Sequence, residues 1–293
     1  MAGAVKRAGR SRLLVGYWGL VALLILALGW IYMTYSYRGD HLRAAEFFYP
    51  EDVLESCPGG RGAVADHVAR DTDAGTHFRV ITPANYRAEV AHPLLVVWAP
   101  AGLNEALSER FTGLTGPATA RGFVVAYVRS VPLGYRALRA LAQVPVDIVA
   151  EWCIDPGRIA YTGHSDGGTV SNALAVLPGL AVRPAAIAPS AMGMQAADMA
   201  EFSCPEPTAV MLMHNLDDDH FPDYGQGVAR WWADCNRCSD NHQPSDHPGC
   251  EAFSDCAATT LLCRAPGNHA HWPAFDHDAM RFLERSLSRP APE

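Results

Sequence analysis

The sequence lacks an excess of basic residues, a high content of charged residues and a triplet repeat of glycine, and each absence excludes a class of protein. Lys and Arg total 23 against 31 Asp and Glu, a formal net charge of −8, so a basic nucleic-acid-binding surface is not expected. Charged residues make up 18% of the chain and hydrophobic residues 49%, which is too apolar for a disordered protein. The 25 Gly and 21 Pro follow no triplet period, which excludes collagen. The 293 residues are enough for one large domain or two small ones with a substantial core.

Charged side chains are also missing from one long stretch near the N-terminus. The run from Leu13 to Met33 contains no Asp, Glu, Lys or Arg, and as a helix it would be roughly 30 Å long, enough to cross a bilayer. Four basic residues precede it, namely Lys6, Arg7, Arg10 and Arg12. This pattern predicts a single-pass signal anchor at 13–33, with residues 1–12 in the cytoplasm and the rest periplasmic or extracellular. The alternative is a cleaved signal peptide and secretion, although the run is long for a signal and has no convincing small-residue cleavage site.

Cysteine is the next informative residue type, because all eight cysteines lie beyond the apolar run. An even number of cysteines on the exported side predicts disulfides. Zinc is the alternative, since Cys235-x-x-Cys238 has the spacing of metal ligands. The second half of a zinc ribbon is missing, however, because Cys250 and Cys256 are six positions apart. We therefore expect disulfides and no metal, with the connectivity left open.

The remainder of the chain predicts one α/β domain at 75–288, after a stalk and lead-in segment at 34–74 and before a tail at 289–293. Runs such as Leu94–Trp98 are apolar throughout, which is typical of strands buried on both faces of a parallel sheet. Their alternation with helical stretches predicts a doubly wound, mostly parallel sheet. We expect a long polar loop at 239–254, strands at 77–81, 94–98, 123–128, 158–162, 185–188, 209–214 and 259–263, and helices near 105–121, 136–152, 167–177, 224–235 and 276–287.

One serine stands in a turn that is typical of a nucleophile. Gly163-His164-Ser165-Asp166-Gly167-Gly168 follows an expected strand and precedes an expected helix, which is the setting of a G-x-S-x-G nucleophile elbow. Gly163 and Gly167 fit this elbow because a sharp turn leaves no room for side chains on either side of the serine. The turn places the Ser165 hydroxyl at a helix N-terminus, where backbone N–H groups favour a developing oxyanion.

A nucleophilic serine needs a base, and the base needs an orienting acid. In an α/β sheet of this kind they follow in the order serine, acid, histidine. Three consecutive aspartates, 217–219, follow the expected strand at 209–214, and His269 and His271 follow the one at 259–263. The order therefore predicts that one of these aspartates and one of these histidines complete a triad.

Several motifs in this order resemble the extracellular polyhydroxybutyrate depolymerase and feruloyl esterase group of α/β hydrolases, of the carbohydrate esterase family 1 type. The resemblance covers roughly residues 75–287. Residues 93–97 lead into an oxyanion loop, residues 154–168 resemble D-x-x-R-[VI]-…-G-x-S-x-G-G, and residues 214–222 resemble H-G-T-x-D-x-x-V-P. Residues 231–238 resemble W-…-N-x-C, and residues 269–273 resemble G-H-x-W-P. The resemblance implies the α/β-hydrolase fold and ester hydrolysis without a cofactor.

The triad follows from this resemblance with one ambiguity. Ser165 takes the place of the nucleophile, and Asp218 that of the acid, because the family aspartate lies four residues before the proline that is Pro222 here. The family histidine would fall on Ala270, so a shift of one residue is needed. We expect His269 to be the base, with His271 as the alternative.

The oxyanion loop departs from the family pattern. Ala99-Pro100-Ala101-Gly102 stands where the family has His-Gly, and Pro100 has no N–H to donate. The resemblance then implies that the N–H groups of Asp166 and of Ala101 or Gly102 form the oxyanion hole. We expect Trp272 to border the acyl pocket.

These features together predict a membrane-anchored, outward-facing serine hydrolase of carboxylic esters, such as a polyester or a feruloyl or acetyl ester. Its expected partners are this ester and, through the N-terminal helix, the membrane. Two alternatives use the same scaffold. One is an acyltransferase that passes the same acyl group to an alcohol, and the other is a non-catalytic binding protein of the cell surface, which the altered oxyanion loop favours.

Overall fold

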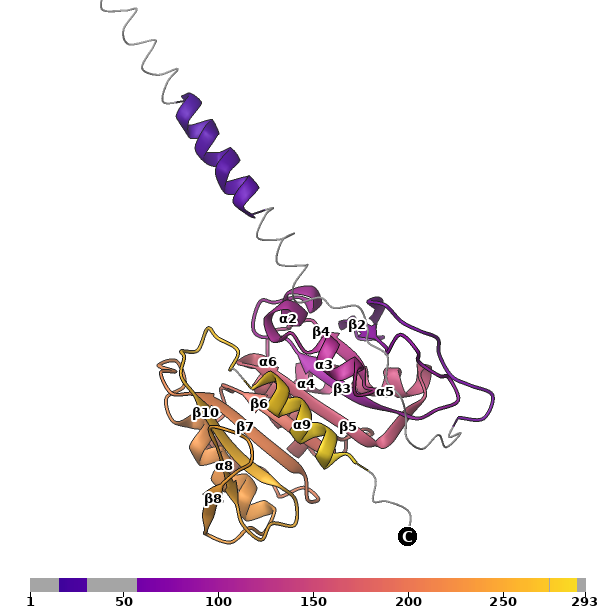
Figure 1. Ribbon diagram of the computed structural model, residues 1–293, viewed down its shortest axis with the longest axis vertical. Helices are drawn as coiled ribbons and strands as arrows, with labels where there is room; N and C mark the ends of the chain where they lie inside the picture. Colours follow the sequence, from indigo (N-terminus) through magenta and orange to yellow (C-terminus); the bar gives the residue numbers. More distant parts are fainter. Residues whose placement is uncertain (1–15, 31–56, 274, 289–293) are drawn as a thin grey trace, which may run out of the picture. The chain divides into compact units, whose positions relative to one another are not determined.

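The structure is a computed structural model that describes residues 16–30, 57–273 and 275–288. The chain divides into two compact units, Met1–Arg43 and Ala44–Glu293. In the first unit, residues 16–30 form a helix (Figure 1). Most of the side chains of this helix are exposed. Over the described residues, no helix combines the length and apolar character needed to cross a membrane.

Several expectations for the chain ends fall outside the described residues. These are the basic segment 1–12, residues 13–15 and 31–33 of the expected span, residues 34–56 of the stalk, and the tail 289–293.

The described part of the second unit is built on one ten-stranded sheet in the order β1-β2-β4-β3-β5-β6-β7-β10-β9-β8 (Figure 1). The run β4-β3-β5-β6-β7-β10 is parallel, whereas β1, β2, β8 and β9 pair antiparallel with their neighbours. The mostly parallel sheet predicted from the sequence is therefore confirmed. The strands are Val68–Asp71 (β1), His77–Ile81 (β2), His92–Trp98 (β3), Val124–Val128 (β4), Ile154–His164 (β5), Ala186–Ser190 (β6), Ala209–Asn215 (β7), His242–Pro244 (β8), Cys250–Phe253 (β9) and Thr260–Ala265 (β10).

The apolar runs form the centre of this sheet because both faces are covered. Every residue of β3, β4 and β7 is buried. Along β3, Leu94, Val96 and Trp98 belong to one hydrophobic cluster and Leu95 and Val97 to the other. This alternation follows from the two-residue period of a strand, and it gives the domain one core on each face.

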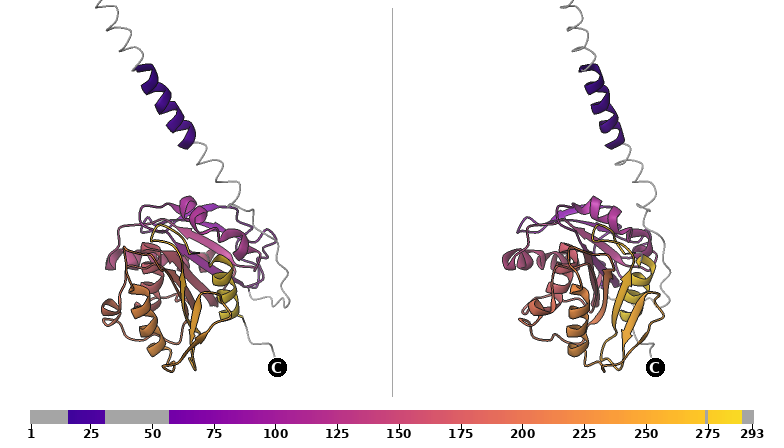
Figure 2. Two further views of the ribbon diagram at one scale, coloured as in Figure 1. Left: turned by 60° about the vertical axis from the view of Figure 1, so that its left-hand side comes forward. Right: turned by 90° about the vertical axis from the view of Figure 1, so that its left-hand side faces the viewer.

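Two groups of helices cover these cores. Side chains of α3 and α9 pack into one cluster, and side chains of α4, α5, α6 and α8 into the other; Figure 2 shows α9 and α8 on opposite sides of the sheet. This is the doubly wound arrangement that the alternation predicted. The helices are Glu105–Thr112 (α2), Thr115–Thr119 (α3), Tyr135–Leu141 (α4), Gln143–Glu151 (α5), Asp166–Val176 (α6), Ala196–Met199 (α7), Tyr224–Cys235 (α8) and Asp276–Ser286 (α9).

Two expected helices are each two helices in the structure. The stretch 105–121 divides at Gly113, which caps α2 in the left-handed conformation with φ 64°. The stretch 136–152 divides at Ala142, between α4 and α5. Pro145 lies in the first turn of α5. Backbone N–H groups in the first turn of a helix have no acceptor within it, so a proline, which has no N–H, is tolerated there. In the interior of a helix that continued α4, the same proline would remove a hydrogen bond.

The edges of the sheet differ from the sequence expectation. The strand β1 precedes residue 75, where we placed the start of the domain, and pairs with β2. The expected loop at 239–254 contains β8 and β9, which extend the sheet beyond β10. The expectation of a strandless loop was therefore wrong. Both β1 and β8 are short and leave polar side chains exposed, so neither carries a hydrophobic pattern.

The described structure pairs all eight cysteines and thus confirms the predicted disulfides. Cys235 and Cys238, which have zinc-ligand spacing, go to different partners. Both cysteines of the alternative zinc motif are therefore used in disulfides. The four pairs are Cys57–Cys153, Cys204–Cys235, Cys238–Cys256 and Cys250–Cys263.

Candidate active site

Ser165 occupies the turn between β5 and α6. Its backbone has φ 55° and ψ −119°, a conformation that costs a non-glycine residue on the order of 1–3 kcal/mol. The neighbouring glycines make the turn compatible with the sheet, because a Cβ at either Gly163 or Gly167 would collide with the carbonyl oxygen of Trp98 at the end of β3. The chain therefore forms the sharp strand-to-helix turn expected around this serine.

His269 lies between Ser165 and Asp218 and contacts both. Its Nε2 is 2.9 Å from Ser165 Oγ, and its Nδ1 is 2.9 Å from Asp218 Oδ2. The three residues follow β5, β7 and β10, whose carboxyl ends meet at the same edge of the sheet. His271, the alternative base, is exposed, and its Nδ1 is 2.7 Å from Asn268 Oδ1. The structure thus brings His269, rather than His271, to the serine.

Among the three consecutive aspartates, Asp218 is the buried one, whereas Asp217 and Asp219 are exposed. Asp218 Oδ1 accepts hydrogen bonds from the backbone N–H groups of His220 and Phe221, each at 3.0 Å. Burial opposes ionisation of the Asp218 carboxyl, but the hydrogen bonds from His269 and the Phe221 N–H outweigh it and hold its pKa below the usual value. Asp218 is therefore an ionised acceptor for the imidazole.

Two further side chains hold the loop that carries His269, and the sequence reasoning missed both. Asn215, the last residue of β7, donates through Nδ2 to the backbone carbonyls of Asn268 and His271, each at 2.8 Å. His164, the last residue of β5, contacts the carbonyl oxygen of His269 at 2.7 Å. The only sequence signal for either residue is its position directly before a candidate loop.

The expected oxyanion groups line one cavity of about 660 Å³. A turn with a Leu103 N–H to Pro100 carbonyl bond of 3.1 Å presents Ala101 and Gly102, and Gly102 has the φ of 75° that a type II turn requires. Asp166 begins α6, where N–H groups have no acceptor within the helix. These three groups therefore share a wall of the cavity although Pro100 cannot donate.

The same cavity is bordered by Asn104, Ser130 and Arg129, whose guanidinium lies 3.3 Å from the Glu105 carboxylate. Trp272, expected at the acyl pocket, is half-buried, and its ring packs edge-on against Phe111 and His164 at 6.3 and 6.2 Å. Within the ranges that the structure describes, no three His, Cys, Asp or Glu side chains are grouped to hold a metal ion.

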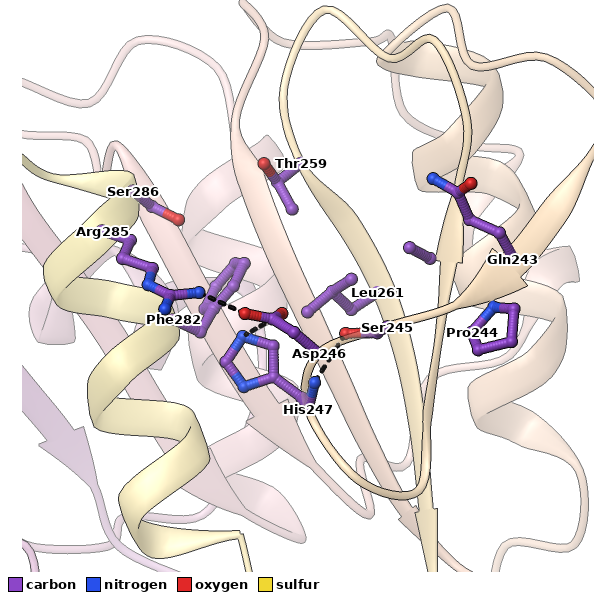
Figure 3. A pocket seen from close by; sticks show the side chains of 11 residues that line it. Gln243, Pro244, Ser245, Asp246, His247, Thr259, Leu261, Phe282, Arg285 and Ser286 are labelled. Atoms are coloured by element: carbon purple, nitrogen blue, oxygen red, sulfur yellow. Dashed lines mark hydrogen bonds and ion pairs between the residues drawn. The ribbon is translucent and has the colours of Figure 1, made fainter.

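A second cavity, of about 330 Å³, lies between the β8–β9 hairpin and α9 (Figure 3). Asp246 and Arg285, which both line it, form an ion pair, and the His247 N–H donates to Ser245 Oγ at 3.0 Å. Its wall includes Leu261 near the start of β10, whereas His269 follows the end of that strand. This cavity is therefore at the opposite edge of the sheet from Ser165 and does not belong to the candidate site.

The comparisons with known proteins concern the fold. No family model matches the sequence, and no curated protein matches it. Solved structures do match. An acetyl xylan esterase from Aspergillus awamori superposes with a TM-score of 0.58 at 14% identity, over 75% of this chain and 97% of the other. A truncated carbohydrate esterase from gut microbiota gives 0.54 at 12% identity, over 78% and 96%.

An S-formylglutathione hydrolase from Staphylococcus aureus also matches, with a TM-score of 0.52 at 12% identity, over 75% of this chain and 97% of the other. At such identities the likeness concerns the fold and not the activity. The chain therefore has the α/β-hydrolase fold of these esterases.

Proposed function

We propose that the chain is a serine hydrolase of carboxylic esters. The observation that carries the proposal is the continuous contact from Ser165 Oγ through the His269 imidazole to the Asp218 carboxylate, at 2.9 Å on either side of the ring. A serine hydroxyl is a weak nucleophile until an adjacent base can take its proton, and that base works best when an acid fixes its tautomer.

The chemistry then follows from these atoms. Ser165 Oγ attacks the acyl carbonyl while His269 Nε2 takes its proton, and His269 returns this proton to the leaving alcohol. Asp218 accepts from His269 Nδ1 and stabilises the imidazolium. The N–H groups of Asp166 and of Ala101 or Gly102 bind the oxyanion. A water molecule then repeats the sequence on the acyl-enzyme, releases the acid and restores Ser165.

The proposed substrates are esters of short or aromatic acids with an alcohol that carries several hydroxyl groups, such as a sugar. Two of the similar structures are a carbohydrate esterase and an acetyl xylan esterase. The cavity beside Asp166 adds support, because Asn104, Ser130 and Arg129 offer it polar groups. A panel of acetyl and feruloyl sugar esters, with a polyester for comparison, ranks these substrates.

The test of the activity uses the full chain in mild detergent. We expect it to hydrolyse p-nitrophenyl acetate and to be labelled covalently by a fluorophosphonate, and we expect Ser165→Ala to lose both. Ser171→Ala is the matched control, because Ser171 is a buried serine of α6 away from the turn. If Ser165→Ala keeps the wild-type esterase rate, the proposed mechanism is wrong.

We also propose that residues 13–33 anchor the protein in a membrane, with the catalytic domain on the outer side. The support is the uncharged apolar run after four basic residues, together with four disulfides in the domain, which form in oxidising compartments. The protein should stay in the membrane fraction after a high-salt wash. A mature N-terminus beyond residue 30 would instead identify a cleaved signal peptide.

A further inference from the structure

A buried histidine next to the nucleophile connects three parts of the site. His164 ends β5, and its side chain is almost completely buried. Its Nδ1 is 2.9 Å from Ser190 Oγ at the end of β6, and its Nε2 is 2.7 Å from the backbone carbonyl oxygen of His269. The backbone carbonyl oxygen of Ser190 also accepts a hydrogen bond of 3.0 Å from the Ser165 N–H. One hydrogen-bonded chain therefore runs from the nucleophile turn to the loop of the base.

The partners of His164 fix which of its nitrogens carries the proton. A carbonyl oxygen only accepts hydrogen bonds, so Nε2 must donate to His269. In the neutral ring Nδ1 is then an acceptor, and the Ser190 hydroxyl donates to it. The ring is neutral at ordinary pH, because burial lowers the pKa of His164 to about 4. The aromatic rings of Phe111, Trp272 and His269 surround it at 5.1, 6.2 and 5.3 Å.

We propose that His164 is a positioning residue, whose Nε2–H holds the backbone of His269 and so sets the distance between the base and Ser165. The inference rests on the proposed function and gives His164 a role that none of the three triad residues has. His164 does not touch the reacting atoms, and it acts only through the main chain of the base.

The need for such a contact follows from how the His269 loop is held. On the side of the acid, Asn215 binds the carbonyls of Asn268 and His271. On the side of the nucleophile, His164 binds the carbonyl of His269 itself. Without His164, the loop keeps its attachment to β7 but loses its attachment to β5. The distance from the imidazole to Asp218 is then still fixed, whereas its distance to the Ser165 hydroxyl, which donates to Nε2, is not.

Two substitutions separate this role from simple packing. In His164→Gln the amide nitrogen reaches the position of Nε2 and can donate to the His269 carbonyl. In His164→Asn the amide ends near the position of Nδ1 and reaches only Ser190. Fluorophosphonate titration counts the active sites, so that kcat can be expressed per site. We expect this kcat to fall about tenfold or more in His164→Asn, with KM unchanged. A tenfold change in rate corresponds to the loss of one hydrogen bond. His164→Gln should stay within about threefold of the wild type, because it keeps that single donor.

The outcomes are distinct. Equal kcat per titrated site in the wild type and His164→Asn would overturn the inference, as would equal losses in both variants, which would indicate packing alone. A wild type without labelling or turnover would instead refute the proposed function.

A second measurement does not need activity. In the full chain labelled with ¹⁵N-histidine, the signals that vanish in His164→Gln identify His164, and they should report a proton on Nε2 and none on Nδ1 at pH 7. A proton on Nδ1 would overturn the inference even in an active enzyme, because Nε2 could then not donate to His269.

Discussion

Two of the disulfides allow a quantitative test of how this domain is stabilised. Cys57–Cys153 and Cys250–Cys263 are buried to a similar extent, since the relative exposures of the cysteines are 4% and 0% in the first pair and 5% and 0% in the second. They differ in the chain they enclose, with sequence separations of 96 and 13. Replacing each pair by alanines removes similar buried groups, so the difference between the two variants reports on the loop closed in the unfolded chain.

The expected magnitudes follow from loop-closure entropy. From the sequence separations, loop closure in the unfolded chain is expected to stabilise the domain by about 4.7 kcal/mol for Cys57–Cys153 and about 2.9 kcal/mol for Cys250–Cys263 at 25 °C. The constant part of the entropy cancels in the comparison, which leaves a difference of about 1.8 kcal/mol in the free energy of unfolding. The long bridge also joins the start of the described domain to the chain just before β5, so its loss releases the segment that leads into β1.

Pulse proteolysis in urea measures the free energy of unfolding of both double variants, Cys57→Ala/Cys153→Ala and Cys250→Ala/Cys263→Ala, beside the wild type. We expect both to be destabilised and the first to be destabilised more. Equal losses, or a larger loss from the short bridge, would refute the entropic argument and indicate that these bridges act through native packing.

Three further predictions concern the candidate site. Asp218→Asn should lower esterase turnover about 10⁴-fold with an unchanged circular dichroism spectrum, because an amide cannot stabilise the imidazolium; a loss below tenfold would contradict the acid role. His269→Ala should abolish turnover and His271→Ala should leave most of it, since His271 contacts Asn268 instead; the reverse result would move the base. Because the pKa of His164 is lowered from 6.5 to about 4, the unfolded chain binds the extra proton between these pH values. The free energy of unfolding should therefore decrease by roughly 3 kcal/mol from this group as pH falls from 7 to 4. A urea midpoint that changes with pH equally in His164→Gln would contradict this.

The centre of the fold could be predicted because it is built from long apolar runs. The strands expected at 94–98 and 209–214 lie within β3 and β7, in which every residue is buried. The outer elements could not be predicted in this way. The four residues of β1 and the three of β8 are ordered by pairing with a neighbouring strand rather than by burial, and such pairing leaves no periodic pattern in the sequence.

The site shows the same division. The order of Ser165, Asp218 and His269 could be predicted because each follows a recognisable strand, and the structure brings these three side chains into contact. The choice between His269 and His271 could not be derived from spacing, because it depends on which way the loop turns after β10. The contacts through which His164 and Asn215 hold the His269 loop go to backbone carbonyls, which every residue type possesses, so no motif points to them.

The order of the strands has a consequence for the protein during its synthesis. Ser165 and His269 are 104 positions apart in the chain, and His269 reaches the serine only when β10 has added in parallel to β7. A ribosome therefore finishes the nucleophile turn long before it makes the base. Until then Ser165 lacks the proton acceptor that the proposed mechanism requires, so the incomplete chain is not expected to react with esters and become acylated.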